Sequence, residues 1–310
     1  MKISFVIPCY RSEKTVGSVI SEIISVMDPS EYDYEIIAVN DCSPDDVWRV
    51  LKDLAGCNKK IKAVCLAKNM NKPSALMAGF NYVTGDYVVF LDDDGQCPMD
   101  HVFELMKPLD EGFDASMARY PKKKQSGFKN FGSWLNSVMA MAMINKPRDL
   151  QVSNFVAVKR FVVDEIIKYN LPYPYFSGLL LRTTSKVTNV EMEERSRKIG
   201  TSTFTFAKLL GVWMNGLTAF SIKPLRLASL IGTIYALMGF LYGTYTIIYK
   251  ILNPAVPKGY SSTIAVIMFT CGIMMLMLGL IGEYLGRIYI CINKSPQFVV
   301  RESVNTEKDE

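Results

Sequence analysis

The chain has 310 residues, of which 49% are hydrophobic, and a formal net charge of +5. This length exceeds that of one small domain and predicts about two units. A single histidine, His101, argues against histidine-based zinc sites and Ser-His-Asp triads, and the seven cysteines lack the spacing of metal ligands.

Apolar runs alternate with helical patterns along the first part of the chain. We expect strands at 3–9, 34–40, 61–66 and 87–91, and helices at 13–26, about 43–54 and 72–82. This alternation predicts an α/β fold with a mostly parallel sheet and helices on both faces. Ligands of such sheets bind at the carboxyl ends of the strands. The site is therefore expected at 8–10, 41–43 and 92–96.

Three adjacent acids, Asp92, Asp93 and Asp94, directly follow the apolar run of the fourth expected strand. Neighbouring carboxylates repel one another, and a cation between them relieves the repulsion. The run thus predicts a divalent-metal site that clamps phosphates. The alternative is a solvated acidic turn. The chain has no GxGxxG or GxxxxGK[ST] motif, which disfavours dinucleotide-binding and P-loop enzymes.

A basic loop at 119–127 contains Arg119, Lys122 and Lys123. It is either a solvated loop or a mobile cover over an anionic substrate. Apolar, aromatic-rich helices are expected at 128–144 and 204–220, either in the core or at a membrane interface.

Two charge-free segments, 227–249 and 261–282, are each long enough to cross a bilayer. A short loop joins them, so they predict a transmembrane hairpin; the alternative is two buried core helices. Basic residues on both flanks place the flanks in the cytoplasm. We therefore expect a multi-pass protein of the inner (cytoplasmic) membrane, with its catalytic domain and both termini cytoplasmic.

Several motifs together resemble the family 2 inverting glycosyltransferases. They are SFVIPCY at 4–10, EIIAVNDCSPD at 35–45 and DDDGQCP at 92–98. Within that family the chain resembles the polyprenyl-phosphate and dolichol-phosphate glycosyltransferases, on the RxxGxS motif at 197–202, the stretch at 217–226 and GEYLGRIY at 282–289. The resemblance covers nearly the whole chain.

The resemblance implies a GT-A-type fold with a mostly parallel sheet, interfacial amphipathic helices and a two-helix transmembrane hairpin. The expected division is a catalytic domain at 1–202, a juxtamembrane helix at 203–224, the membrane helices at 225–286 and a cytosolic tail at 287–310. It also implies assembly as a homo-tetramer. We expect no nucleic-acid partner.

The resemblance assigns roles to individual residues. The metal, Mg²⁺ or Mn²⁺, is assigned to Asp92, Asp94 and Gln96, and catalysis to Asp94, Asp92 and Arg119. The nucleotide sugar is assigned to Pro8, Tyr10, Glu13, Asp41, Asp92 and Lys72. The phosphates and the lipid acceptor are assigned to Arg119, Lys122, Lys123, Arg197 and Ser202. Asp93 falls where relatives often have Ala, so it is the acid expected to matter least.

The expected reaction transfers a sugar, with inversion, from a nucleotide diphosphate sugar (a UDP-sugar is favoured) to undecaprenyl or another polyprenyl phosphate. The product would serve as donor for modifying cell-envelope glycans. Two departures concern the acceptor: Asn154 and Val156 stand where many relatives have an acid and an arginine. The alternatives are a processive polysaccharide synthase, which the missing QxxRW motif disfavours, and a non-catalytic membrane scaffold with the same fold.

Overall fold

The computed structural model describes residues 1–120, 147, 149–193, 195, 223–253, 259–293 and 295–306. The chain divides into two compact units. The first comprises Met1–Phe206 and Lys294–Glu310, and the second comprises Ala207–Asn293. The helices expected at 128–144 and 204–220, and most of the basic loop, lie outside the described residues.

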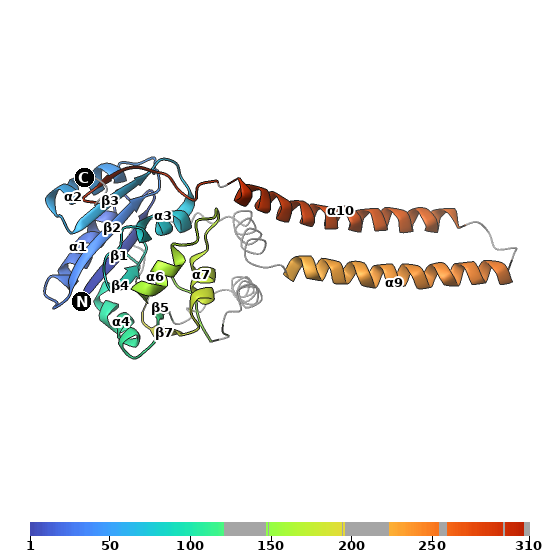
Figure 1. The fold of residues 1–310 in the computed structure, drawn as a ribbon, viewed down its shortest axis with the longest axis horizontal. Coiled ribbons are helices and arrows are strands. Elements are labelled where there is room, and N and C mark those ends of the chain that lie inside the picture. Colours follow the sequence, from blue (N-terminus) through green and yellow to red (C-terminus); the bar gives the residue numbers. More distant parts are fainter. Residues whose placement is uncertain are drawn as a thin grey trace. The chain divides into compact units, whose positions relative to one another are not determined.

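The first unit alternates strands with helices, as the sequence pattern predicts (Figure 1). Its strands are β1 (Lys2–Cys9), β2 (Asp33–Asn40), β3 (Ile61–Leu66), β4 (Tyr87–Phe90), β5 (Ala115–Arg119), β6 (Val156–Lys159), β7 (Val187–Glu191) and β8 (Val300–Val304). Its helices are α1 (Val16–Met27), α2 (Val47–Cys57), α3 (Asn71–Phe80), a short 3-10 turn η1 (Met99–His101), α4 (Val102–Asp110), α6 (Arg160–Ile166) and α7 (Phe176–Thr183). His101 is the last residue of η1 and directly precedes α4.

The strands form one sheet in the order β7-β5-β6-β4-β1-β2-β3-β8. The central strands β4, β1, β2 and β3 are mutually parallel, while β6 and β8 pair antiparallel with their neighbours. The chain leaves β1 toward β2 and β3 on one side and later adds β4 on the other. The carboxyl ends of β1 and β4 therefore flank a topological switch point, where open α/β sheets bind ligands.

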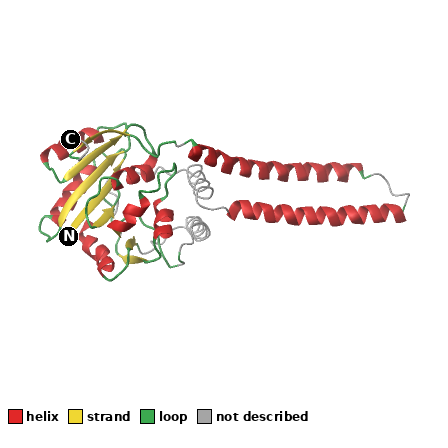
Figure 2. Cartoon of the chain, viewed as in Figure 1, coloured by secondary structure: helices red, strands yellow, loops and turns green. Residues whose placement is uncertain are grey.

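Helices flank the sheet of the first unit (Figure 2), and alternate residues of each strand point to its opposite faces. Ile3, Phe5 and Ile7 of β1 join the core formed with α1, α2 and α4. On the other face α3 approaches β1 so closely that a Cβ added at Gly79 would overlap Val6 Cγ1. Glycine at position 79 therefore allows α3 to lie close to the sheet. The position of the first turn of α3 depends on this close packing.

A buried ion cluster lies at the amino-terminal edge of the central strands. The side chain of Glu35 in β2 is 3% exposed. Its oxygens accept hydrogen bonds from Ser4 Oγ at 2.6 Å and from Thr84 N at 2.6 Å, and pair with Lys2 Nζ at 3.0 Å and Lys62 Nζ at 2.9 Å. Burial opposes ionisation, but these donors outweigh it and lower the pKa of Glu35 to about 2.

The second unit contains two long helices, α9 (Lys223–Leu252) and α10 (Tyr260–Ile292). They run side by side (Figure 1). Among the described residues one stretch, Phe269–Ile292, is long and apolar enough to cross a membrane. This stretch begins within the second expected span, 261–282, and continues past its end.

The chain returns from α10 to the first unit. Residues 295–306 belong to that unit, and β8 pairs antiparallel with β3, with Val64 opposite Ser303 and Cys65 opposite Glu302. Trp48 Nε1 in α2 donates a hydrogen bond to Glu302 Oε1 at 2.5 Å. Part of the segment expected to be a cytosolic tail, Val300–Val304, thus forms an edge strand of the sheet.

Candidate active site

Asp92 lies at the carboxyl end of β4, beside the switch point. The apolar residues before it, through Leu91, are buried and fix the strand in the sheet. Asp92 Oδ1 pairs with Lys72 Nζ in the first turn of α3. Asp92 Oδ2 accepts a hydrogen bond from Asn154 Nδ2 at 3.0 Å, although the two residues lie far apart in sequence. The structure thus brings together Asp92 and Lys72, both predicted for the site, and adds Asn154.

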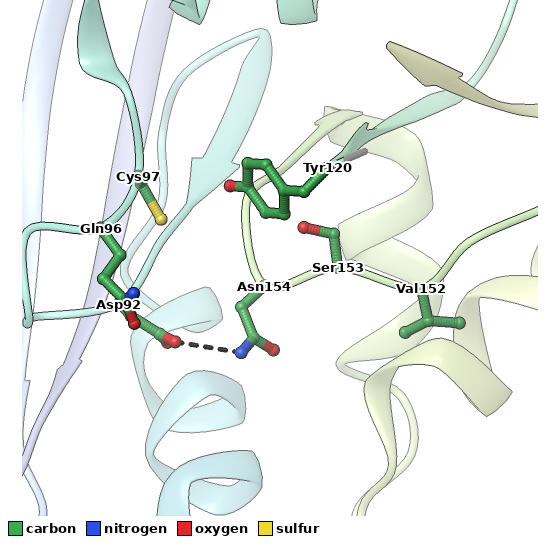
Figure 3. A pocket seen from close by; sticks show the side chains of 7 residues that line it. All are labelled: Asp92, Gln96, Cys97, Tyr120, Val152, Ser153 and Asn154. Atoms are coloured by element: carbon green, nitrogen blue, oxygen red, sulfur yellow. Dashed lines mark hydrogen bonds between the residues drawn. The ribbon is translucent and has the colours of Figure 1, made fainter. Parts of the chain in front are cut away.

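A pocket of about 320 Å³ opens at this point. Asp92, Gln96 and Cys97 form one wall, and the opposite wall comes from the ends of other strands (Figure 3). That opposite wall consists of Tyr120, Val152, Ser153 and Asn154. Burial raises the pKa of the Cys97 thiol to about 12, so the thiol stays protonated. The pocket therefore offers carboxylate, amide and hydroxyl groups rather than a thiolate.

Asp93 turns away from this pocket toward the first strand. Its Oδ2 accepts a hydrogen bond from Tyr10 N at 3.0 Å. Burial is the main cause that raises the pKa of the Asp93 carboxyl to about 6; the charge of Asp92 contributes to this rise, and the Tyr10 N–H opposes it. Asp93 joins the turns after β1 and β4 across the switch point. This structural role was not foreseen, since the resemblance made Asp93 the least important of the three acids.

The rest of the acidic turn is shaped by its backbone. Gly95 has φ +74°, a conformation that favours glycine. Asp94 Oδ1 accepts a hydrogen bond from Gln96 N at 3.1 Å, and Gln96 Nε2 donates to Arg195 O at 3.3 Å. Arg195 in turn pairs with Glu22 and, at 2.6 Å, with Asp100. Arg195 was missed by the sequence analysis, because its acidic partners lie in distant segments.

Asp41 lies at the end of β2 and is 2% exposed. Its Oδ1 accepts a hydrogen bond from Met70 N at 2.7 Å, at the amino terminus of α3. Burial raises the pKa of Asp41, and the backbone N–H groups of Met70 and Asn71 partly offset that rise. Because Lys72 follows in the same turn, the start of α3 contacts Asp41 on one side and Asp92 on the other.

Glu13 is engaged with the neighbouring loop. Its Oε2 accepts a hydrogen bond from Asp46 N at 3.0 Å, while Glu13 N donates to Asp45 Oδ2 at 3.0 Å. Arg11 N donates to Ser43 Oγ at 2.8 Å. These bonds join the loops after β1 and β2. Helix α1 accordingly begins at Val16, three residues later than expected.

The remaining predicted residues fall into two groups. Pro8 lies within β1, opposite Val39, and Arg119 at the end of β5 pairs through Nε with Glu191 Oε1 at 3.7 Å. Arg119 is not among the residues that line the pocket, although its neighbour Tyr120 is. The predicted phosphate-binding residues outside the described part of the chain are Lys122, Lys123, Arg197 and Ser202.

The donor set fits a hard divalent cation. Asp92, Asp94 and Gln96 offer oxygens, the ligands that Mg²⁺ and Mn²⁺ prefer. Within the described residues no group of three or more His, Cys, Asp or Glu side chains is arranged to hold a metal. The ion pair between the Lys72 ammonium and Asp92 shows that this carboxylate attracts positive charge.

Comparisons with known proteins agree on the class of protein. The family description "Glycosyl transferase family 2" matches residues 4–168, and "GtrB C-terminal hairpin" matches residues 223–288. CsbB of Bacillus subtilis (strain 168), whose name places it among the glycosyltransferases, is 32% identical over 99% of this chain and 93% of its own length. An undecaprenyl-phosphate 4-deoxy-4-formamido-L-arabinose transferase of Proteus mirabilis is 28% identical over 99% of this chain and 95% of its own length.

A solved structure shares the fold. Glucosyl-3-phosphoglycerate synthase from Mycobacterium tuberculosis, crystallised with Mn²⁺, UDP-glucose and phosphoglyceric acid, superposes with a TM-score of 0.50 at 20% identity. The match covers 70% of this chain and 79% of that one. At this identity the likeness concerns the fold alone. It confirms the expected GT-A-like architecture with a mostly parallel sheet.

Proposed function

The chain belongs to glycosyl transferase family 2 and is a glycosyltransferase, and from this premise we propose that it transfers one sugar from a nucleotide diphosphate sugar to a polyprenyl phosphate. The observation that carries the proposal is the Asp92 pocket at the switch point, together with Asp41 on the far side of the α3 amino terminus. The Proteus mirabilis relative, whose name includes undecaprenyl phosphate, supports the acceptor class.

The donor lies across the ends of β2, β1 and β4. Asp41 receives the nucleotide base, as the resemblance implies, and the diphosphate lies near Asp92. A divalent cation bound by Asp92, Asp94 and Gln96 would supply Lewis-acid stabilisation of the leaving nucleoside diphosphate. Lys72 holds positive charge at the same carboxylate and neutralises the diphosphate further. A UDP-sugar is the donor that we propose.

The acceptor requires no strong general base. A phosphate monoester has a second pKa of about 6, so it is largely dianionic at neutral pH and already nucleophilic. Asn154, which faces Asp92 across the pocket, has no basic group, and its amide donates to Asp92 Oδ2 instead. In-line attack by the acceptor oxygen on the anomeric carbon forms the sugar–phosphate bond, breaks the bond to the nucleoside diphosphate and inverts the configuration.

Bringing two anions together needs positive charge. We assign this role to Arg119, which lies at the end of β5 beside Tyr120, and to Lys122, Lys123 and Arg197 of the resemblance, with the Ser202 hydroxyl as a neutral hydrogen-bond donor to phosphate. In the structure Arg119 pairs with Glu191 at 3.7 Å. An incoming phosphate competes with Glu191 for this guanidinium, and phosphate is favoured because it is a dianion whereas Glu191 makes only the long contact through Nε.

The membrane assignment rests on the second unit. The match to a GtrB C-terminal hairpin over residues 223–288 and the apolar stretch Phe269–Ile292 support two membrane-crossing helices, α9 and α10. The acceptor is an isoprenoid lipid, so an enzyme fixed to the bilayer meets it at the membrane surface. We place the catalytic unit and both termini in the cytoplasm, because the flanks of the two spans are basic.

The test uses the full chain in membranes with undecaprenyl phosphate, Mn²⁺ and a panel of UDP- and GDP-sugars. We expect one lipid product, heavier than the acceptor by a single sugar, with one donor of the panel. A series of products that grow by repeated sugars would instead identify a processive synthase. If no donor gives a product although the chain inserts and folds normally, the result would favour a non-catalytic membrane scaffold.

A further inference from the structure

The segment after α10 contacts the described part of the first unit along its length. Gln297, which is 6% exposed, donates through Nε2 to Tyr169 O at 3.1 Å and to Leu171 O at 2.8 Å. At the other end of the segment, Asn305 Nδ2 donates to Ala55 O at 2.7 Å and to Ile61 O at 2.9 Å. Between these anchors β8 forms the edge of the sheet beside β3.

The segment also contacts the loop that leaves β3. Ala67 N donates to Val299 O at 2.8 Å, and Arg301 Nη2 donates to Ala67 O at 3.2 Å. Both backbone polar groups of Ala67 are therefore bound by the C-terminal segment. The β8 ladder shifts register between Cys65 and Leu66, so the segment follows the chain as it leaves the sheet.

This loop supplies the contacts of Asp41. Only two residues separate Ala67 from Met70, whose N–H binds Asp41 Oδ1 at 2.7 Å. Asn71 then adopts φ +69°, which tightens the entry into α3. Lys72 in the next position pairs with Asp92. A displacement of the loop at Ala67 therefore also moves Met70 and Lys72. It thus changes the contacts to Asp41 and Asp92 at the two ends of the donor site.

We infer that residues 295–306 position the nucleotide end of the donor site, with Arg301 and Val299 holding the loop from Ala67 to Asn71 against Asp41. The inference rests on the proposed function, because it assigns the nucleotide of the donor to Asp41. Arg301 acts through the loop and does not touch the substrate. The segment thereby makes the chain beyond the membrane hairpin a part of the donor site.

The test compares Arg301→Ala and Arg301→Lys with Asn305→Ala in the full chain. Asn305→Ala is the matched control, because it removes hydrogen bonds of the same segment at the opposite end of β3, away from Asp41. We expect Arg301→Ala to raise the KM for the nucleotide sugar and the Kd of the free nucleotide by about three- to tenfold, as loss of one charged donor would. The kcat and the KM for polyprenyl phosphate should change little.

We expect Arg301→Lys to restore part of the nucleotide affinity, and Asn305→Ala to lower Tm without changing that affinity. Unchanged nucleotide affinity in Arg301→Ala would overturn the inference. So would equal losses of affinity in Arg301→Ala and Asn305→Ala, since the segment would then act through stability alone. A wild-type chain that binds the nucleotide but does not glycosylate polyprenyl phosphate would refute the proposed acceptor and leave this binding test intact.

Discussion

Glu35 should make the catalytic unit sensitive to acid, and the replacement Glu35→Gln tests this. The hydrogen bonds and lysines around Glu35 lower its pKa to about 2. Each pH unit between the folded and unfolded pKa is worth about 1.4 kcal/mol, so ionised Glu35 contributes about 3 kcal/mol to the free energy of unfolding. Its side chain is 3% exposed, so solvent screens the cluster only weakly.

The sign follows from the lowered pKa. The contribution is fully present above the unfolded pKa of about 4.3 and is lost as the pH falls from there to about 2. Near-UV circular dichroism of the full chain in detergent, with urea as denaturant, measures the free energy of unfolding from pH 6 to pH 2. The wild type should lose about 3 kcal/mol more than Glu35→Gln over this range. Parallel pH curves for the two proteins would refute the assigned role of the cluster.

Three further replacements test the site and the packing beneath it. Asp93→Ala should lower kcat/KM by about tenfold, whereas Asp93→Asn should keep most of the activity because its amide oxygen still accepts from Tyr10 N. Equal losses of kcat/KM in the two variants would contradict the role of Asp93 in joining the turns after β1 and β4. Asn154→Asp places a second carboxylate against Asp92, so Mn²⁺ should raise the Tm of this variant more than that of the wild type, and an equal rise would count against a metal there. Gly79→Ala should lower the free energy of unfolding by about 1–3 kcal/mol in urea titration, through overlap with β1; an unchanged midpoint would show that α3 shifts freely.

The parts of the fold that the sequence predicted are those with strong local patterns. Apolar runs bounded by polar turns located the central strands closely, and β3 has the expected bounds, Ile61–Leu66. Strand β8, with the sequence VRESV, could not be recognised in this way. Edge strands often carry charged residues, and the pairing of β8 with β3 joins segments that lie far apart in the sequence.

The site was predictable to a similar degree. Asp92 and Asp41 were placed by the rule that ligands lie at the carboxyl ends of parallel strands. The contacts that orient them come from elsewhere: Asn154 reaches Asp92 because β6 pairs with β4, and Met70 reaches Asp41 because α3 starts beside β2. Such contacts depend on the tertiary arrangement, so residue types and spacing alone did not reveal them.

The central claim is that the acidic turn after β4 holds the diphosphate of the donor through a divalent cation. Isothermal titration of UDP into the full chain, with and without Mn²⁺, tests this most directly in the wild type and in Asp92→Ala. The account predicts that Mn²⁺ strengthens UDP binding at least about tenfold in the wild type and has little effect in the variant. Binding of UDP that is equally strong with and without Mn²⁺, or equally strengthened by Mn²⁺ in both proteins, would contradict it.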